Sequence, residues 1–490
     1  MRPEILGTKH ADYFQIPAAV WNSLVSVLTA ASREVVSKVA EAFKGGVEKT
    51  VGQLLDQGIP SLVYELGRDI MESILLSVRG FLGSTIRCHL CPDAVLSYER
   101  DENKDVMTRL GRVSFRRAYY HGPCGHSALP ADSLLGVDGE HKILPELQEV
   151  IARFCGQAPY QRATELICSL LPVRCSHTTA ERVTETIATE LQVQQEAECH
   201  QAFAKDGKHL FPHAEPVPAA PVAVVSSDGG FCRVRDHSES SKQFMVGVLG
   251  TLDPKPYTTW EERKVNLESK RYVATAAGGI DPFYQLMAIE FQRMGLDRMP
   301  LLQIIGDGSE SILPRLKLLG ALDQEVFETL DFFHASEYVG TASKLIFRPE
   351  SAEQQSWCEA MNDELLEGRL PTFFAELRAR QRAAQQQGQS DTAEQLQGIH
   401  DYFDRRRHML RYKEAIDRGL LIGSGVMEGG VRFIGKDRLH LTGMRWNVDG
   451  ADSILRLRAV DASNRWGDFC SRRAARRAGR YSELRARWAA

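Results

Sequence analysis

Acidic residues at the ends of apolar segments are the side chains in this sequence best placed to do chemistry. The apolar run Leu301–Ile305 predicts a buried strand, and it ends in Gly306-Asp307-Gly308. Flanking glycines let the backbone approach a ligand closely, so Asp307 can serve metal binding or proton transfer at a sheet edge. An isolated Gly-Asp-Gly is also an ordinary turn, and the functional interpretation therefore depends on further carboxylates that join Asp307.

Two other carboxylates are candidates for the same site. Asp228 follows the apolar segment Val222–Val225, and Glu428 follows a glycine-rich apolar segment. The order of segments from 222 to 333 is three strands, a helix, a strand, a helix and a strand, which is the order of an RNase H-like domain. Because the first and fourth strands of that fold lie side by side, Asp228 and Asp307 would converge. Three carboxylates from separate segments can hold two Mg²⁺ or Mn²⁺ ions, which support in-line displacement at phosphorus.

The strands of this predicted domain are short apolar segments separated by turn residues. The first three form an antiparallel meander in this prediction, with a turn at 228–230 between the first and the second. The predicted elements are strands at Val222–Val225, Phe231–Val234 and Phe244–Leu249, a helix around 284–291, a strand at 301–305, a helix at Ile312–Leu319 and a strand at Thr329–Phe333.

A group of cysteines and histidines has the spacing of a zinc site. Cys88 and Cys91 precede a β-like segment, and His121 and Cys124 follow it. Two ligand pairs, each separated by two residues and held at opposite ends of a hairpin, suit tetrahedral zinc. His126 competes for the fourth position, and the alternative is a small β-module with unlinked thiols. Because such ribbons usually stabilise a small domain, the site is predicted to be structural.

Basic residues near Glu428 are candidates for contacts to a phosphate backbone. A helix that continues from Glu428 places Arg432 and Lys436 on one face with it. The segment from Arg465 onward is rich in arginine, and a solvated helix face is its alternative interpretation. The predicted DNA contacts are Arg432, Lys436, Arg438, Arg445, Arg405, Arg406 and Arg407.

Size and composition indicate a protein of several globular modules. The chain has 490 residues, of which 43% are hydrophobic and 25% charged, as is ordinary for globular proteins. A net charge of −4 excludes a global attraction to nucleic acid, so such contacts must come from local patches. The cysteines are scattered apart from one close pair, and neither a membrane span nor a signal peptide is evident, which predicts a reducing cytoplasm.

Helical segments surround the predicted catalytic domain. The stretch 18–82 is helical by pattern, and a helix at Tyr160–Leu171 followed by caps at Ser176–Thr179 outlines a helix-turn-helix; simple packing is the alternative for both. The Gln- and Arg-rich stretch 378–397 is predicted to be disordered or a solvated helix. The predicted fold class is therefore α+β and multidomain. The predicted boundaries are 1–84 (helical), 85–136 (zinc-ribbon-like), 137–210 (helical, DNA-binding), 211–221 (linker), 222–336 and 421–464 (the two parts of the RNase H-like domain), 337–420 (all-helical insertion) and 465–490 (basic tail).

Several strings of residues stand in a specific order between about residue 85 and residue 460. They are Gly306-Asp307-Gly308, Asp331-Phe332-Phe333-His334-Ala335-Ser336-Glu337-Tyr338, Ile422-Gly423-Ser424-Gly425 with Glu428, Gly443-Met444-Arg445-Trp446-Asn447, and Leu455-Arg456-Leu457-Arg458. In combination these strings closely resemble bacterial insertion-sequence transposases of the Kra family. Those proteins are DDE enzymes distantly similar to the eukaryotic Mutator transposases.

The resemblance implies a transposase that binds the ends of a mobile element and cleaves and joins DNA with two divalent metal ions. It implies that Asp228, Asp307 and Glu428 are the metal ligands. Asp331 and His334 match an Asp-x-x-His pair that follows the second Asp in these relatives. His334 is expected near the scissile phosphate or a flipped-out DNA end, and a capped core histidine is the alternative.

The sequence departs from the family pattern at two histidines. His121 stands where a zinc-ribbon cysteine is expected, and His440 stands where a basic residue more often precedes Gly-Met-Arg-Trp, which weakens a phosphate contact there. The expected partners are double-stranded DNA and further copies of the chain, in a dimer or larger assembly associated with the bacterial nucleoid. Two alternatives stay open: a domesticated DNA-binding protein that no longer cuts, and a nuclease of the same fold that hydrolyses without joining.

Overall fold

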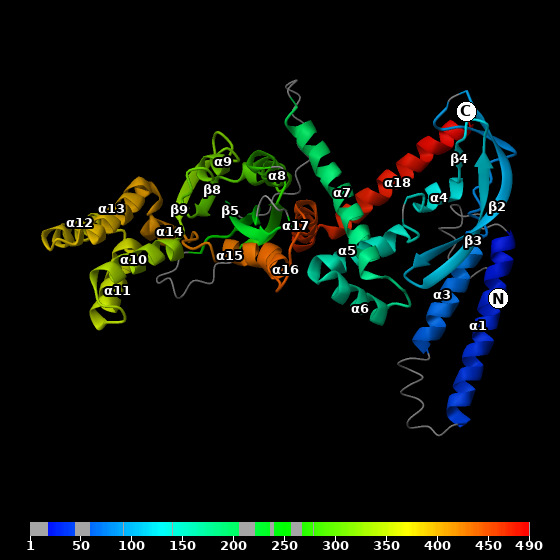
Figure 1. Cartoon of the computed structure of the whole chain (residues 1–490), viewed down its shortest axis with the longest axis horizontal. Helices are drawn as coiled ribbons and strands as arrows, with labels where there is room; N and C mark the ends of the chain where they lie inside the picture. The colour runs from blue at the N-terminus through cyan, green and yellow to red at the C-terminus, as the bar shows by residue number, and fades with distance from the viewer. Residues whose placement is uncertain are drawn as a thin grey trace. The chain divides into compact units, whose positions relative to one another are not determined.

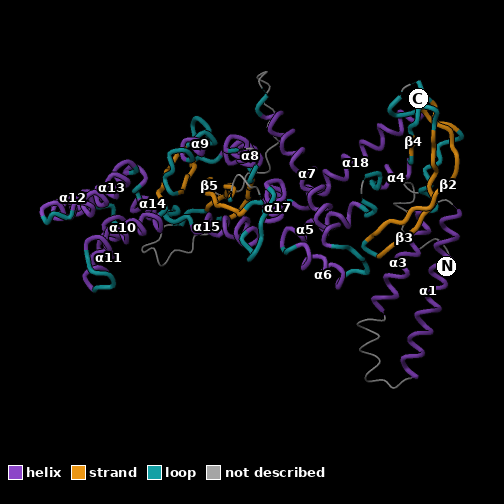
Figure 2. Tube along the Cα trace, viewed as in Figure 1, coloured by secondary structure: helices purple, strands orange, loops and turns teal. Residues whose placement is uncertain are grey.

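The protein has a mixed α+β architecture (Figure 1, Figure 2). The computed structural model describes residues 18–44, 59–91, 93–139, 141–204, 221–235, 240–255, 267–277 and 279–489. The chain divides into two compact units: Met1–Ile187 with Gly467–Ala490 form unit 1, and Ala188–Trp466 form unit 2. Within the described ranges, no helix is long and apolar enough to cross a membrane. Of the predicted linker at 211–221, only residue 221 falls within them.

Unit 1 contains a four-stranded antiparallel sheet that follows two long helices. The helices lie in the predicted helical stretch 18–82, of which 45–58 is outside the described ranges. The strands follow one another in space as they do in the chain, in the order β1-β2-β3-β4. These elements are α1 (Ala18–Lys44), α3 (Ile59–Leu75), β1 (Thr85–Arg87), β2 (Val95–Thr108), β3 (Gly111–His121) and β4 (Ser127–Ala128).

Four helices continue the chain after this sheet: α4 (Pro130–Leu135), α5 (Pro145–Gln157), α6 (Tyr160–Leu170) and α7 (His177–Ala202). The Thr179 N–H donates to Ser176 Oγ at 3.1 Å, so the predicted cap is confirmed. The helix before it ends at Leu170, next to the helix-breaking Pro172, as predicted. Recognition of DNA bases by these helices stays a prediction.

Unit 2 is built on a five-stranded mixed sheet with the order β7-β6-β5-β8-β9. Strand β6 pairs antiparallel with both β5 and β7, whereas β8 pairs in parallel with both β5 and β9. The strand predicted at Thr329–Phe333 lies earlier in the chain, because a helix begins at Phe332. The strands are β5 (Val222–Arg233), β6 (Ser241–Leu252), β7 (Glu268–Thr275), β8 (Leu301–Gly306) and β9 (Glu325–Leu330).

The first two predicted strands of this sheet are a single strand. Strand β5 continues through 228–230, so the predicted turn at that position is wrong. A Cβ atom at Gly230 would lie 2.5 Å from the ring of Phe244, its partner on β6, so this glycine makes room for an aromatic ring. The third strand is β7, which was not predicted because its first residues are polar or charged.

The two faces of the sheet are buried in different cores. Ala223 and Val225 of β5 pack with α8 (Ile280–Arg293), and Val222 and Val224 pack with the helices that follow β9. Alternate residues of a strand point to opposite faces, so a strand covered on both sides reads as one continuous apolar run. The helix pair η4 (Leu296–Arg298) and α9 (Leu313–Lys317) flanks β8 in the chain.

A helical region separates β9 from the Glu428 segment (Figure 1). Its helices share one hydrophobic core, and the stretch 378–397 contributes buried residues such as Ala384 and Leu396. Of the two predicted alternatives for that stretch, disorder is therefore wrong, whereas a helix with a mostly solvated surface is confirmed. The many polar residues on the exposed faces of α12 and α13 made the few buried apolar positions of this helical hairpin difficult to recognise in the sequence. The helices are α10 (Phe332–Ile346), α11 (Ala352–Leu366), α12 (Leu370–Gln386), α13 (Ser390–Arg405), η5 (Arg407–Met409) and α14 (Tyr412–Asp417).

The chain ends in a further series of helices, and the last of them belongs mostly to unit 1. In α18, Arg473 is buried and pairs with Glu149 at 3.1 Å, and Arg480 pairs with Asp138 at 3.0 Å. Part of the predicted basic tail is therefore occupied by ion pairs within unit 1. The helices are α15 (Gly425–Val431), the π-helix η6 (Arg432–Lys436), α16 (Asp437–Leu439), α17 (Val448–Ala462) and α18 (Trp466–Ala489).

Candidate functional site

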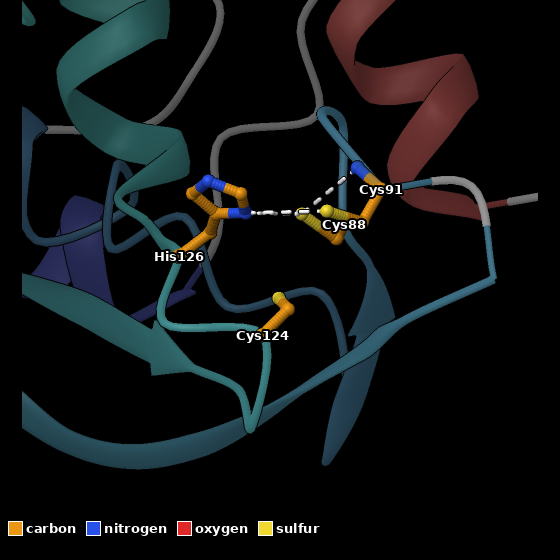
Figure 3. Close-up of side chains that lie close together, drawn as sticks. All are labelled: Cys88, Cys91, Cys124 and His126. Carbon is orange, nitrogen blue, oxygen red and sulfur yellow. Dashed lines mark hydrogen bonds between the residues drawn. The ribbon is translucent and has the colours of Figure 1, made fainter.

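Cys88, Cys91, Cys124 and His126 bring four potential metal ligands together in unit 1 (Figure 3). Their ligand atoms all lie within 4.8 Å of one another. The Nδ1 atom of His126 is 3.4 Å from Cys91 Sγ and 3.7 Å from Cys88 Sγ. Zinc bonds of about 2.3 Å to sulfur and about 2.0 Å to nitrogen put tetrahedral ligand atoms about 3.5–3.8 Å apart. This Cys–His cluster can therefore hold a metal ion such as zinc.

The histidine of the Cys–His cluster is His126, and the prediction of His121 as a ligand is wrong. His121 is the last residue of β3 and pairs with Ser127 of β4, whose Oγ atom is 3.0 Å from His121 Nδ1. Its ring stacks on Tyr119, two residues earlier on the same face of the strand. The chain then turns through Gly125, whose φ of +78° favours glycine, and carries His126 to the cysteine pair.

The first two thiols of the cluster have shifted pKa values in opposite directions. Desolvation opposes ionisation of Cys88, but hydrogen bonds from the Leu90 and Cys91 N–H groups and from neighbouring thiols outweigh it, so the Cys88 pKa is lowered. Desolvation raises the pKa of Cys91, and the charges of Cys88 and Cys124 raise it further. One thiolate therefore makes the next harder to form, and a coordinated cation relieves this repulsion.

The C-terminal helix completes the hydrophobic core around the Cys–His cluster. Trp488 of α18 is 3% exposed and shares a core with Ile86, Cys88 and Leu96. Its ring lies edge-on to His89, with the two ring centroids 6.3 Å apart. Trp488 was not predicted, because an arginine-rich tail carries no local signal of its tertiary partner.

Asp228 and Asp307 occupy matching positions at one edge of the sheet of unit 2. The parallel pairing of β5 with β8 ends at the pair Val225 and Ile304. Each aspartate lies three residues beyond that last pair. The two side chains therefore come from adjacent strands, just beyond the point where their pairing ends. We call Asp228, Asp307 and Glu428 the acidic edge.

The carboxyl group of Asp228 interacts with its neighbours electrostatically. Its pKa is raised, first by desolvation and also by the charge of Asp307. The Gly229 N–H, which donates to Asp228 Oδ1 at 2.6 Å, and the charges of Lys436 and His334 act in the opposite direction. Asp228 is therefore close enough to Asp307 for mutual repulsion, and a bound cation would relieve that repulsion.

Glu428 lies exposed on α15, which packs against β5 and β6. Among the described residues, only the Cys–His cluster has three or more ligand atoms that all lie within 4.8 Å, so the acidic edge does not form a single-ion cage. Two metal ions about 3.5–4 Å apart spread their ligands over a wider space, so the acidic edge need not satisfy that limit. Its water-accessible carboxylate oxygens fit hard divalent cations such as Mg²⁺ or Mn²⁺.

Asp331 connects α10 to the segment that precedes Glu428. It is the N-cap of α10, where one carboxylate oxygen accepts the Phe333 N–H at 2.9 Å and the other accepts the Ser424 hydroxyl. A Cβ atom at Gly423 would lie 2.6 Å from the Phe333 ring, so this glycine permits the close approach. Asp331 thus has a structural role here, and its participation in catalysis stays a prediction.

His334 lies one turn along α10 and is half-buried beside two tyrosines. Its ring centroid is 5.3 Å from that of Tyr338 and 6.2 Å from that of Tyr402. Its Nδ1 atom is 3.6 Å from a carboxylate oxygen of Glu337. Because the charge of His334 also affects the pKa of Asp228, its imidazole lies within electrostatic reach of the acidic edge.

Gln303 is a buried residue of β8 that holds the Glu428 segment against the sheet. Its Nε2 atom donates to Leu421 O at 2.6 Å, and its Oε1 atom accepts the Leu421 N–H at 3.0 Å. Its Nε2 atom also donates to Thr329 Oγ1 on β9 at 3.0 Å. A single amide in an otherwise apolar strand was the available sequence signal, because a buried amide requires hydrogen-bond partners.

No protein-family model matches this chain, and no curated protein matches it. Its functional assignment therefore depends on the residues and their geometry.

The predicted DNA contacts divide into exposed and buried residues. Arg438 is fully buried, with its guanidinium 4.8 Å from the Trp446 ring centroid, so its prediction as a DNA contact is wrong. Arg406 is half-buried, and its Nε atom donates to Gly308 O at 3.0 Å, which gives it a role within the protein. The exposed members are Arg405, Arg407, Arg432, Lys436 and Arg445.

The helix after Glu428 is not a regular α-helix, so Glu428, Arg432 and Lys436 do not share the face that a continuous α-helix would give them. Residues 432–436 form the π-helix η6, so their spacing does not follow one α-helical face. A Cβ atom at Gly435 would lie 2.4 Å from the Phe244 ring, and Arg458 Nε donates to Ile434 O at 2.9 Å. Close packing on β6 and a buried guanidinium therefore stabilise the irregular turn.

Proposed function

We propose that this chain is a DDE transposase that binds the ends of a mobile element and catalyses divalent-metal-dependent DNA cleavage and strand transfer. The observation that carries the proposal is the matched position of Asp228 and Asp307 beyond the β5–β8 pairing, with the charge of Asp307 raising the pKa of Asp228. The strand order β7-β6-β5-β8-β9, with β5 parallel to β8, is the order of an RNase H-like domain and supports it. The helices of 337–420 would be the insertion of that domain.

The acidic edge would hold two Mg²⁺ or Mn²⁺ ions. When bound, such ions activate the attacking oxygen and stabilise the leaving oxygen of an in-line displacement. Asp228 and Asp307 supply carboxylates from adjacent strands, and Glu428 supplies the third from α15. Asp331 orients the Glu428 segment through Ser424, so its removal would disturb the third ligand without removing it.

Cationic side chains near the acidic edge would hold the DNA backbone. Lys436 acts electrostatically on Asp228, and Arg432 and Arg445 are exposed in the same part of the chain. His334 would donate a hydrogen bond or a proton to a phosphate oxygen. The Cys–His cluster would bind a structural zinc ion in a module that contributes to DNA binding. Because two element ends must be paired, the active form would be a dimer or a larger assembly.

The test uses the full chain, labelled DNA from the regions that flank its coding sequence, and Mg²⁺. Joined products that appear in Mg²⁺ and disappear in excess EDTA are the expected result. Hydrolysed ends without joined products would identify a nuclease of the same fold. Retained binding without any cleavage, across Mg²⁺ and Mn²⁺, would identify a non-cutting DNA-binding protein and contradict the proposal.

A further inference from the structure

The loop that carries Asp307 is held by two side chains from α13 and the turn after it. The Tyr402 hydroxyl donates to Asp307 O at 3.1 Å, and Arg406 Nε donates to Gly308 O at 3.0 Å. Two consecutive carbonyl groups of the loop are therefore fixed by donors almost 100 residues further along the chain. These bonds join the helical region after β9 to the acidic edge.

The two donors are themselves held in place. The Tyr402 ring stacks on Tyr338, with centroids 3.9 Å apart and an interplanar angle of 7°. The Arg406 guanidinium lies over the Tyr402 ring, with its Cζ atom 4.1 Å from the ring centroid. Its Nη1 atom donates to Tyr402 O at 3.2 Å.

The loop is shaped to receive these donors. Gly308 has a φ of +73°, and a Cβ atom there would lie 2.5 Å from Arg406 Nε. The Ser309 N–H donates to Asp307 Oδ1 at 2.9 Å, so one carboxylate oxygen is oriented by the loop itself. The direction of the Asp307 carboxylate therefore depends on the backbone that Tyr402 and Arg406 fix.

We propose that Tyr402 and Arg406 are positioning residues that orient Asp307 for binding a divalent cation. The helical region after β9 would then contribute to cation binding at the acidic edge. This inference rests on the proposed function, which puts divalent cations at the acidic edge, and cation binding is tested without DNA so that it is separated from catalysis. The same aromatic stack touches His334, whose ring faces both Tyr338 and Tyr402. Arg406, which was predicted to contact DNA, orients the loop instead.

The test compares two Tyr→Phe variants that each remove one buried hydroxyl from the same core. Tyr402→Phe keeps the ring stack and loses the bond to Asp307 O. Tyr412→Phe is the matched control, because the Tyr412 hydroxyl is buried and has no hydrogen-bond partner among the described residues. Arg406→Met removes the second donor, and Arg406→Lys keeps a charged donor and measures rescue.

Binding of Mn²⁺ to the zinc-loaded full chain without DNA is the first readout, measured by electron paramagnetic resonance of free Mn²⁺. We expect Tyr402→Phe to weaken Mn²⁺ binding about 3- to 10-fold, the value of one hydrogen bond, and Tyr412→Phe to match the wild type. Arg406→Met should weaken binding at least as much, and Arg406→Lys should recover part of the loss. Wild-type Mn²⁺ affinity in both Tyr402→Phe and Arg406→Met would overturn the proposal.

Cleavage kinetics on DNA ends are the second readout. Tyr402→Phe should lower kcat at fixed Mg²⁺ and leave KM for DNA unchanged, because DNA contacts are retained. A general loss of folding would instead lower the melting temperature and reduce the number of Mn²⁺-binding sites and cleavage in proportion to the unfolded fraction, which would overturn the positioning role. If the wild type binds Mn²⁺ at the acidic edge but cuts no DNA, the proposed function fails, and the Mn²⁺ comparison still decides the role of Tyr402.

Discussion

The Cys–His cluster of unit 1 and the acidic edge of unit 2 differ in how closely their side chains gather. The ligand atoms of the Cys–His cluster all lie within 4.8 Å of one another, and those of the acidic edge do not. Local turns and a shared hydrophobic core hold the first set. The second set comes from three separate segments, and its aspartates repel each other. The first arrangement fits a structural metal site, which is closed by folding, and the second fits the proposed catalytic site, which would stay open to substrate.

The sharpest test of the Cys–His cluster compares its two candidate histidines, His126 and His121. His126→Ala should lower zinc affinity by about 100-fold or more, because one of four ligands is lost, and should lower the stability of unit 1. His121→Ala should keep zinc, since His121 bonds to Ser127 outside the cluster. Zinc content after dialysis, measured by mass spectrometry, checks both. Zinc lost from His121→Ala and kept in His126→Ala would reverse the assignment.

A smaller effect is expected when the core around the Cys–His cluster is opened without removing a ligand. Trp488→Ala should cost about 2–4 kcal/mol of stability and speed zinc release to a chelator by about 10-fold or more. Arg485→Ala, at an exposed position of the same helix, is the control. Equal release rates in Trp488→Ala and the wild type would show that α18 does not contribute to metal retention.

The smallest expected effect concerns how the charge of Asp228 at the acidic edge changes the stability of the fold. The pKa of Asp228 is raised in the folded chain, so its contribution to stability is present below the usual aspartate pKa and is lost as the pH rises through the raised value. Because Asp228 is exposed and its charge is screened by solvent, Asp228→Asn should raise the melting temperature at pH 7 by no more than about 1 °C, and this gain should shrink toward acidic pH. Thermal denaturation across that pH range measures it.

Asp331→Asn is the contrasting variant. Asp331 caps α10 and accepts the Ser424 hydroxyl, so its replacement should lower the melting temperature. A lower melting temperature in Asp228→Asn at pH 7 would mean that Asp228 is a structural residue and that the acidic edge carries no strain.

The elements that define both sites were largely predictable, because their signals are local. Strand β8 is a run of apolar residues bounded by Pro300 and Gly306, and its parallel pairing with β5 follows from the order of the elements. The cysteine pair stands out by spacing, whereas the matched spacing of the second pair favoured His121 and Cys124 over the observed Cys124 and His126. His126 was one of two candidates, and the choice depended on the turn after β3, which carries His126 and not His121 to the cysteine pair.

The remaining features depend on partners far away in the chain. Gly229 and Gly230 read as a turn, but both pair with β6 in an unbroken ladder, and the Phe244 ring fills the space beside Gly230. Arg438 reads as a surface cation, and its burial is decided by Trp446. The Tyr402 hydroxyl donates to the carbonyl oxygen of Asp307, almost 100 residues earlier in the chain, and no local sequence pattern predicts that contact.

The most direct measurement of the central claim is DNA cleavage by variants of the acidic edge. Asp228→Asn, Asp307→Asn and Glu428→Gln remove one carboxylate charge each and keep the shape of the side chain. The account predicts that each lowers Mg²⁺-dependent cleavage by about 1,000-fold or more while binding of end DNA stays within about 2-fold of the wild type. Cleavage near the wild-type rate in any one of the three would contradict the assignment of that residue as a metal ligand.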